Sequence, residues 1–287
     1  MSVSVFALIK NESQFIGYSV MSLLPYVDEF CYGDGNSTDG TLELLDYIKK
    51  KYDPENKIKV FRDFDFSDFK DDYVKKFNEI MNKANGGYKF YCHPDMILTD
   101  PGQLVNREKW KDFAYFVNMR SFAGEDMDLE IIKGRTNKWK TIMKNGFGLH
   151  YWGYYGDQNE DMYFKAITGD THRVYQDMRQ YPFQVGDSGV KISHFCECKP
   201  RARREEKMKT VFKTVGLMKT DDSEIHEFDL VSSHPRVHLQ NHSGPWGSFE
   251  FTPRKDALPD VFEKHKQEFD EVLGRKLEDI GSVAGAR

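Results

Sequence analysis

Short apolar runs alternate with amphipathic segments along the first hundred residues of the chain. The apolar runs are too short for helices and predict strands, whereas the segments between them place apolar residues at helical spacing. The predicted strands are Val3–Ile9, Phe30–Tyr32, Ile58–Phe61 and Tyr88–Cys92. The predicted helices begin near Ile16, Leu42 and Asp68, and the chain breaks after them at Pro25, Tyr52 and Asn85. This alternation predicts an α/β fold with a mostly parallel central sheet flanked by helices and joined by right-handed crossovers.

The rest of the chain has a weaker pattern. Further strands are predicted at Phe113–Met119, Leu129–Ile132 and Val190–Phe195, and further helices at Glu160–Ile167, Lys199–Lys219 and Leu258–Val272. The segment between Ile132 and Trp152 is polar and rich in Gly, Lys and Asn, so we expect it to be irregular.

Composition narrows the classes of protein that fit. The chain has 287 residues, of which 39% are hydrophobic and 30% charged, the balance of a globular protein. No run approaches the roughly 20 apolar residues of a membrane span. The net charge of −5 argues against non-specific binding to polyanions. Four cysteines form no disulfide framework in a chain of this length, and the N-terminus resembles a strand rather than a secretory signal, so we expect a cytoplasmic protein.

Polar residues follow three of the predicted strands at their carboxyl ends. Lys10-Asn11-Glu12 follow the first strand, a loop from Asp34 to Thr41 follows the second, and His93-Pro94-Asp95 follow the fourth. In an open parallel sheet, ligands bind in the crevice outside these strand ends. A carboxylate such as Asp95 can hold a hard divalent cation, which neutralises the phosphates of a nucleotide. The alternative is structural: Asp34 fixes its turn and Asp39 caps the next helix.

These motifs, in this order, resemble those of a family-two glycosyltransferase with the GT-A nucleotide-sugar-binding fold. The loop Asp34–Thr41 is similar to the family's Asp-x-Gly-Ser-Thr-Asp-Gly-Thr, and the family's metal motif Asp-Ala-Asp-Glu falls on His93–Met96. A Glu-Asp pair that opens a helix in the family matches Glu160-Asp161. The resemblance implies a nucleotide-sugar-binding and catalytic domain over residues 1–198. The remaining residues, 199–287, would be a helical and loop extension that packs over the active site.

The resemblance implies a nucleotide-sugar donor, with UDP as the favoured carrier. Asp34 would contact the base or the ribose of the nucleotide. A basic run that includes Arg201 either grips the diphosphate or forms a solvated helix face, since Glu205 and Glu206 follow it. The implied nucleotide-sugar-binding residues are Leu8, Asn11, Glu12, Asp34, Asp39, His93 and Arg201.

The implied chemistry is an inverting displacement that depends on Mn²⁺ or Mg²⁺. Asp161 would be the general base that takes a proton from the acceptor hydroxyl, with Glu160 as the alternative base. Asp95 would bind the metal. His93 stands where the family has an Asp, and His194, at the end of a later predicted strand, would be the supplementary metal ligand.

Other interpretations remain open. His238 and His242 compete with His194 as the supplementary ligand. A nucleotidyltransferase on a similar fold is one rival, although the first loop lacks the Gly pair that such chemistry favours. A non-catalytic nucleotide-sugar-binding module is another, because His93 and Met96 replace acidic residues of the family. A glycan is the expected acceptor, and a modified DNA base is the minority option.

Overall fold

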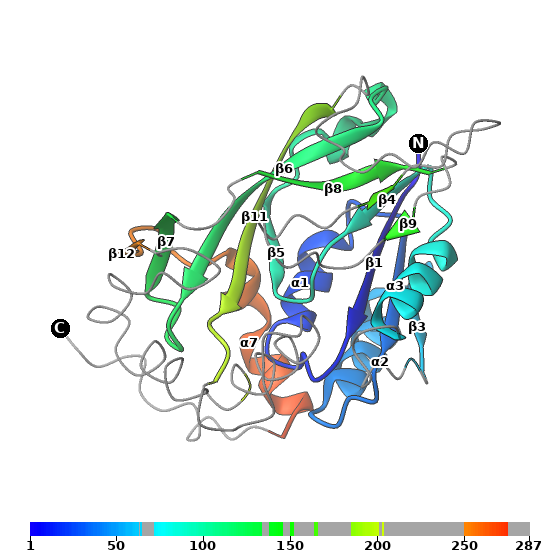
Figure 1. Cartoon of the computed structure of the whole chain (residues 1–287). Coiled ribbons are helices and arrows are strands. Elements are labelled where there is room, and N and C mark those ends of the chain that lie inside the picture. The colour runs from blue at the N-terminus through cyan, green and yellow to red at the C-terminus, as the bar shows by residue number, and fades with distance from the viewer. Residues whose placement is uncertain are drawn as a thin grey trace, which may run out of the picture.

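The strands and helices predicted for the first hundred residues are present in the computed structural model (Figure 1). The structure describes residues 1–62, 64, 72–133, 138–145, 150–151, 164–165, 185–200, 203 and 250–274. Its strands are β1 (Val3–Ile9), β2 (Glu29–Asp34), β3 (Ile58–Phe61), β4 (Tyr88–Tyr91), β5 (Met96–Asp100), β6 (Ala114–Ala123), β7 (Leu129–Lys133), β8 (Lys138–Lys144), β9 (His150–Tyr151), β10 (Phe164–Lys165), β11 (Val185–Glu197) and β12 (Glu250–Pro253). Its helices are α1 (Ile16–Leu23), α2 (Thr41–Tyr52), α3 (Asp72–Lys83), the 3₁₀ helix η1 (Gly102–Lys109) and α7 (Asp260–Val272).

The first four strands form the parallel part of the central sheet. They lie in the order β3-β2-β1-β4, and all three neighbouring pairs are parallel. The register pairs Ile9 with Asp34, so β1 and β2 end side by side. The carboxyl ends of these strands therefore meet at one edge, as the alternation of strands and helices predicts.

Beyond β4 the sheet becomes mixed. β8 pairs antiparallel with β4 and β6, β7 pairs antiparallel with β6 and β12, and β5 pairs antiparallel with β11. β11 is parallel to β6. The expectation of parallel pairing thus holds for β1 to β4, and the later half of the sheet adds antiparallel strands.

The prediction that the segment between Ile132 and Trp152 is irregular is wrong for residues 138–144. These residues form β8, which lies between β4 and β6. Their polar composition hides two core residues, because Ile142 and Met143 are fully buried. The segment hydrogen bonds to β4 on one edge and to β6 on the other. This pairing makes it a strand although its local preference for a strand is weak.

The helix predicted at Glu160–Ile167 is wrong for its two described residues. Phe164 and Lys165 form β10, which pairs antiparallel with His150 and Tyr151. The rest of that segment, including Glu160 and Asp161, lies outside the described residues.

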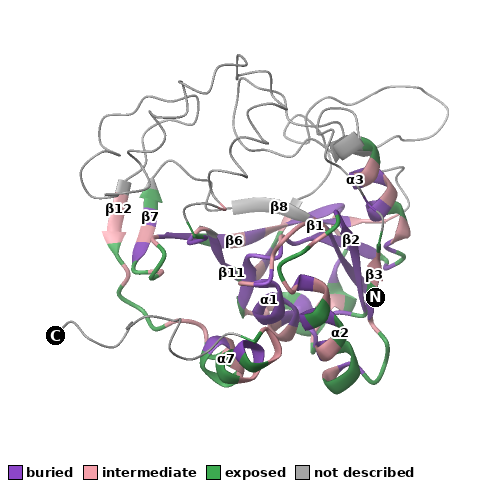
Figure 2. Ribbon diagram, turned by 90° about the horizontal axis from the view of Figure 1, so that it is seen from below, coloured by how far each residue is buried: buried purple, intermediate pink, exposed green. Residues whose placement is uncertain are grey.

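Helices cover both faces of the sheet. Figure 2 shows α1, α2 and α7 on one face and α3 on the other, with a buried layer between them. The predicted closing helix is confirmed as α7, which packs on α1 through Tyr18, whose ring lies 4.4 Å from that of Phe262 and 5.2 Å from that of Phe269. The fit is close at Gly17, where an added Cβ would lie 2.7 Å from Phe269. Residues from the expected extension, 199–287, therefore pack on α1 as part of the same fold.

No helix among the residues that the structure describes is long and apolar enough to span a membrane.

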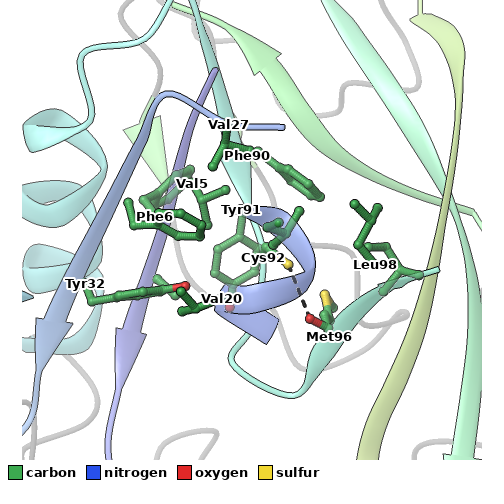
Figure 3. Packing of buried hydrophobic residues seen from close by; sticks show 14 of the residues in the cluster. Val5, Phe6, Val20, Val27, Tyr32, Phe90, Tyr91, Cys92, Met96 and Leu98 are labelled. Carbon is green, nitrogen blue, oxygen red and sulfur yellow. Dashed lines mark hydrogen bonds between the residues drawn. The ribbon is translucent and has the colours of Figure 1, made fainter. Parts of the chain in front are cut away.

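The core lies on both faces of the parallel strands. Figure 3 shows Val5, Phe6, Val20, Tyr91 and Cys92 in it. All five are at most 1% exposed. The rings of Phe6 and Tyr91 lie 5.5 Å and 5.0 Å from that of Phe77 in α3. The same core extends past the end of β4, and this anchors the loop that carries Asp95.

Candidate functional site

Two loops at the carboxyl ends of β1 and β2 are joined by hydrogen bonds. The Asn11 amide donates to Ser37 Oγ at 2.8 Å, and Asn11 Oδ1 accepts from the Thr38 amide at 2.7 Å. The Glu12 amide donates to Thr41 Oγ1 at 2.7 Å. Asn11 has a φ of 54°, a left-handed conformation that Asn adopts more readily than most residues. The structure therefore brings the Asn-Glu pair and the Asp34–Thr41 loop together, as the sequence predicts.

Asp34 ends β2 with its side chain in the turn. It is 1% exposed, and its carboxylate accepts hydrogen bonds from Ser37 Oγ at 2.5 Å and from the Ser37 amide at 3.1 Å. Its carbonyl accepts from the Phe64 amide at 3.0 Å. The turn-fixing role is therefore real, and the role in binding a base or ribose stays a prediction.

Asp39 holds the beginning of α2. Its carboxylate accepts from the Thr41 amide at 3.1 Å and from the Ser13 amide at 3.0 Å. Asp39 precedes the N-cap residue Gly40, so it holds the first helical amide and ties the helix to the first loop. Burial raises the pKa of Asp39, but the hydrogen bonds from Thr41 and Ser13 outweigh it and hold the pKa below its usual value. This is the structural alternative that the sequence left open for Asp39.

Asp95 lies in the short turn between β4 and β5. Cys92 before it and Met96 after it are each 1% exposed, and Figure 3 shows both side chains in the core, with the Cys92 thiol 3.9 Å from the Met96 carbonyl oxygen. The Met96 carbonyl also accepts from Ser19 Oγ at 2.7 Å. Met96 stands where the resembled family has an acidic residue because this position belongs to the core here. The turn is thus fixed on both sides, and Asp95 itself is 1% exposed.

β11 brings His194 to Asp95. The register pairs His194 with Met96, and the Phe195 amide donates to the Asp95 carbonyl at 2.9 Å. His194 Nε2 lies 3.3 Å from Asp95 Oδ1. The structure thus brings together the two residues that the resemblance assigns to a metal, and their role as metal ligands stays a prediction.

His93 stands beside this pair. Its ring centroid is 6.0 Å from that of His194, and its Nε2 is 2.5 Å from the Tyr91 hydroxyl. Leu8 is partly buried against the core, and an added Cβ at Gly33 would lie 2.9 Å from its side chain, which places Leu8 beside the end of β2.

The side chain of Lys199 joins the two predicted groups. Its ammonium lies 2.6 Å and 2.8 Å from the two carboxylate oxygens of Glu12, and 3.0 Å from Asp95 Oδ2. The side chain of Lys199 is 5% exposed and that of Asp95 is 1% exposed. One buried cation therefore bridges the end of β1 and the end of β4.

The charge on Lys199 is maintained by its partners. Burial by itself lowers the pKa of a lysine, because it penalises the charged form. Here the carboxylates of Asp95 and Glu12 outweigh burial and hold the pKa of Lys199 above its usual value.

The chain after β11 is held against the first loop by further contacts. The guanidinium of Arg203 donates to the carbonyls of Lys10 and Asn11, each at 2.9 Å. Gln14 Nε2 donates to the Cys198 carbonyl at 3.3 Å. Lys199 and Arg203 thus place two cationic side chains at the loop that the sequence assigns to the nucleotide.

These residues fit a resident divalent metal poorly. Among the described residues, no group of three or more His, Cys, Asp and Glu side chains is placed to hold a metal ion. The ammonium of Lys199 already lies between the carboxylates of Glu12 and Asp95. A divalent ion that ligated both carboxylates would meet this positive charge at short range. The assignment of Asp95 and His194 to Mn²⁺ or Mg²⁺ stays a prediction.

Three predicted site residues, Glu160, Asp161 and Arg201, lie outside the described residues, as do His238 and His242. Lys199 is the main residue of the candidate site for which sequence reasoning did not predict the contacts. It opens the basic run, which favoured a solvated face as much as a phosphate contact. Its only local signal is its position at the start of the basic run, four residues after the predicted strand Val190–Phe195.

Comparison with known proteins gives structural matches of low similarity. No protein-family model matches the chain, and no curated protein sequence matches it. The chain is similar to S. aureus TarS with 20% identity over 43% of this chain and 22% of that chain, with a TM-score of 0.35. A structure of S. aureus TarS 1–349 in complex with UDP-GlcNAc matches 84% of this chain and 74% of that chain, with 11% identity and a TM-score of 0.43. The inositol-1-phosphate CTP transferase from T. maritima matches 75% of this chain and 98% of that chain, with 10% identity and a TM-score of 0.39.

Proposed function

We propose that this protein is a glycosyltransferase that moves a sugar from a nucleotide-diphosphate donor, with UDP as the favoured carrier, to an acceptor hydroxyl. The observation that carries the proposal is the convergence of three strand ends. Glu12 after β1 and Asp95 after β4 share the ammonium of Lys199, and the Asp34 loop is hydrogen bonded to the Glu12 loop. Ligands of α/β sheets bind at such a crevice.

The residues that match the Asp loop and the Glu-Asp pair of the resembled family then have proposed roles. Asp34 contacts the base or ribose from the turn that it fixes. Asp161 acts as general base on the acceptor hydroxyl as that hydroxyl attacks the anomeric carbon, with Glu160 as the alternative. A single displacement of this kind inverts the configuration at the anomeric carbon. The hydroxyl proton goes to the carboxylate, and the nucleoside diphosphate leaves with the electron pair of the glycosidic bond.

The acceptor class is proposed from analogy alone. A glycan hydroxyl is the first candidate, and a hydroxyl on a modified DNA base is the second. Nucleotidyl transfer remains the rival chemistry, and it differs in consuming a nucleoside triphosphate.

The test of donor binding is a thermal-shift panel with UDP, GDP, CMP and dTDP. A ligand that binds only the folded state raises Tm by mass action. We expect UDP to give the largest shift and Asp34→Asn to reduce it, because Asn can keep the hydrogen bonds of the turn but loses the charge. Asp46→Asn is the matched control, since Asp46 makes only an exposed ion pair with Arg62.

The test of chemistry uses Asp161→Asn. This variant is expected to lose transfer activity by about 10²–10⁴-fold and to keep the UDP shift, because a general base contributes to the rate rather than to donor binding. If no nucleotide shifts the wild-type protein, the proposed donor is wrong. If CTP or UTP, added to the same panel, shifts the protein and no diphosphate does, nucleotidyl transfer replaces sugar transfer.

A further inference from the structure

The contacts of Lys199 set it apart from the other lysines that the structure describes in ion pairs. Its ammonium contacts Glu12 at 2.6 Å and Asp95 at 3.0 Å, and the three side chains are 5%, 13% and 1% exposed. The two carboxylates come from loops that are more than eighty residues apart in the chain. The ammonium donates hydrogen bonds to both oxygens of Glu12 and forms an ion pair with Asp95 Oδ2 at 3.0 Å.

A buried charge of this kind is costly unless it is paired. Removing an ion from water costs several kcal/mol, and a pair repays this only with good geometry and satisfied hydrogen bonds. Without the ammonium, Glu12 and Asp95 would leave two negative charges facing a bound diphosphate. A positive charge between them lowers the repulsion that an anion would meet here.

We propose that Lys199 is the resident cation of this crevice: its ammonium takes the position between Glu12 and Asp95 that a divalent metal ion would otherwise hold, so that the donor diphosphate binds without added metal. This inference rests on the proposed function for the identity of the ligand. Lys199 acts as a positioning residue, because it fixes two carboxylates and offsets one of their two negative charges.

The distances favour an ammonium over a metal ion. Contacts of 2.6 to 3.0 Å are hydrogen-bond lengths. Mg²⁺ requires oxygen ligands at about 2.0–2.1 Å in near-octahedral geometry, so the same oxygens would have to close in around it. The backbone limits that movement, because the turn of Asp95 is fixed by buried residues on both sides.

The neighbouring contacts support the same role. Arg203 reaches the carbonyls of Lys10 and Asn11 and places a second cation beside the first. Arg and Lys are the side chains that bind phosphate oxygens most strongly. The segment from Cys198 to Arg203 therefore supplies positive charge to the donor loop from within the chain.

The first arm of the test uses the wild-type protein. The UDP-induced rise in Tm is measured in EDTA and in Mn²⁺ over a range of UDP concentrations. We expect the apparent affinity for UDP to differ by less than about threefold between the two conditions, a difference well under 1.4 kcal/mol, the tenfold step. A UDP shift that EDTA abolishes and Mn²⁺ restores would overturn the proposal. This arm needs no variant and holds even if the variants below do not fold.

The second arm measures Mn²⁺ binding without nucleotide. Lys199→Met removes the ammonium and leaves Glu12, Asp95 and His194 around the space. We expect this variant to bind Mn²⁺ at least about tenfold more tightly than the wild type and to be stabilised by it. The gain should disappear in Lys199→Met/Asp95→Asn. A merely structural role for Lys199 predicts no gain of metal binding.

Two further variants complete the design. Lys199→Arg keeps the charge and is expected to keep UDP binding in EDTA, whereas Lys199→Met loses it. Lys191→Met is the matched control, because Lys191 pairs with Asp100 at 2.9 Å but its side chain is 63% exposed. It is expected to behave as the wild type in both arms. If Lys199→Met binds Mn²⁺ no better than wild type, the proposal is wrong.

The two proposals fail in different ways. If no nucleotide shifts the wild type but Lys199→Met gains Mn²⁺ binding through Asp95, the donor assignment fails and the resident cation stands. If UDP binds only with Mn²⁺, the donor assignment stands and the resident cation fails.

Discussion

Two buried polar clusters lie at opposite ends of the same parallel strands, and they are built differently. At the amino end, Glu29 of β2 accepts hydrogen bonds from Ser4 Oγ at 2.5 Å, from the Asn85 amide at 2.9 Å and from Lys59 Nζ at 2.5 Å. At the carboxyl end, Lys199 bridges Glu12 and Asp95. Both clusters tie loops to the sheet, yet their charge and exposure differ.

The amino-end cluster pairs one carboxylate with one lysine. The side chain of Lys59 is 45% exposed, so its ammonium reaches water, and the remaining partners of Glu29 are neutral. At the carboxyl end, one lysine that is 5% exposed serves two carboxylates, with His194 beside them. A cluster that only holds the fold together can be balanced one to one, whereas an excess of buried ionisable groups at a crevice is typical of a functional site.

The largest expected difference between the clusters is in stability. Lys199→Met should lower the free energy of unfolding by about 3–5 kcal/mol, because it leaves buried carboxylates without their cation. Lys59→Met should cost about 1 kcal/mol or less, because its partner keeps two neutral donors and the lysine is half exposed. Urea unfolding of the two variants and the wild type measures this. Equal losses of unfolding free energy in the two variants would mean that the lysine at the carboxyl end stabilises the fold no more than the lysine at the amino end.

A smaller effect is expected at Glu29 itself. Burial raises the pKa of Glu29, but hydrogen bonds from Lys59, Ser4 and Asn85 outweigh it and hold the pKa below its usual value of 4.5. A carboxyl with a lowered pKa contributes stability above its unfolded pKa, and that contribution is lost as the pH falls through the folded pKa. Glu29→Gln should therefore cost about 1–3 kcal/mol at pH 7 and progressively less below about pH 4.5.

The measurement for Glu29 is the free energy of unfolding of wild type and variant between pH 7 and pH 3. The difference between the two should narrow in the acid range, and UDP binding at pH 7 should be the same in both. A constant difference across this range would show that the hydrogen bonds of Glu29 do not depend on its charge.

The smallest effect is expected where an ion pair lies on the surface. Lys191→Met breaks a pair with Asp100 in which the side chains are 63% and 43% exposed. It should change the free energy of unfolding by less than about 1 kcal/mol. Melting in low and high salt measures it, and the wild-type and variant curves should converge as salt screens the pair. A large loss of stability in Lys191→Met would mean that side-chain exposure does not determine how much an ion pair contributes.

The early half of the fold could be predicted because its signals are local. Val3–Ile9 is an apolar run that coincides with β1, and the helical spacing from Leu42 to Tyr52 matches α2 apart from its first residue. β8 is not predicted, although Lys138 and Lys140 alternate with Trp139 and Thr141, because the pair Ile142-Met143 breaks the alternation and the flanking residues are polar. It is a strand because β4 and β6 flank it, which is a property of the folded sheet.

The candidate site likewise contains residues that local sequence patterns predict and one residue that they do not. Asn11, Glu12, Asp34 and Asp95 could be placed from sequence, since each follows a recognisable strand. Lys199 could not, because its contact with Glu12 spans 187 residues and it opens a basic run that fits a solvated helix face equally well. Its burial depends on the register of β11 against β5, which no local pattern specifies.

The distance along the chain between Asp95 and Lys199 has a consequence during synthesis. A ribosome adds about 5–20 residues per second, so the lysine is made several seconds or more after the second carboxylate. Over that interval the nascent chain carries Glu12 and Asp95 without their counter-charge, and both must stay hydrated. Lys199 can reach the two carboxylates only once β11 has been translated and inserted beside β5. The site therefore forms only after most of the chain has been synthesised and β11 has joined the sheet.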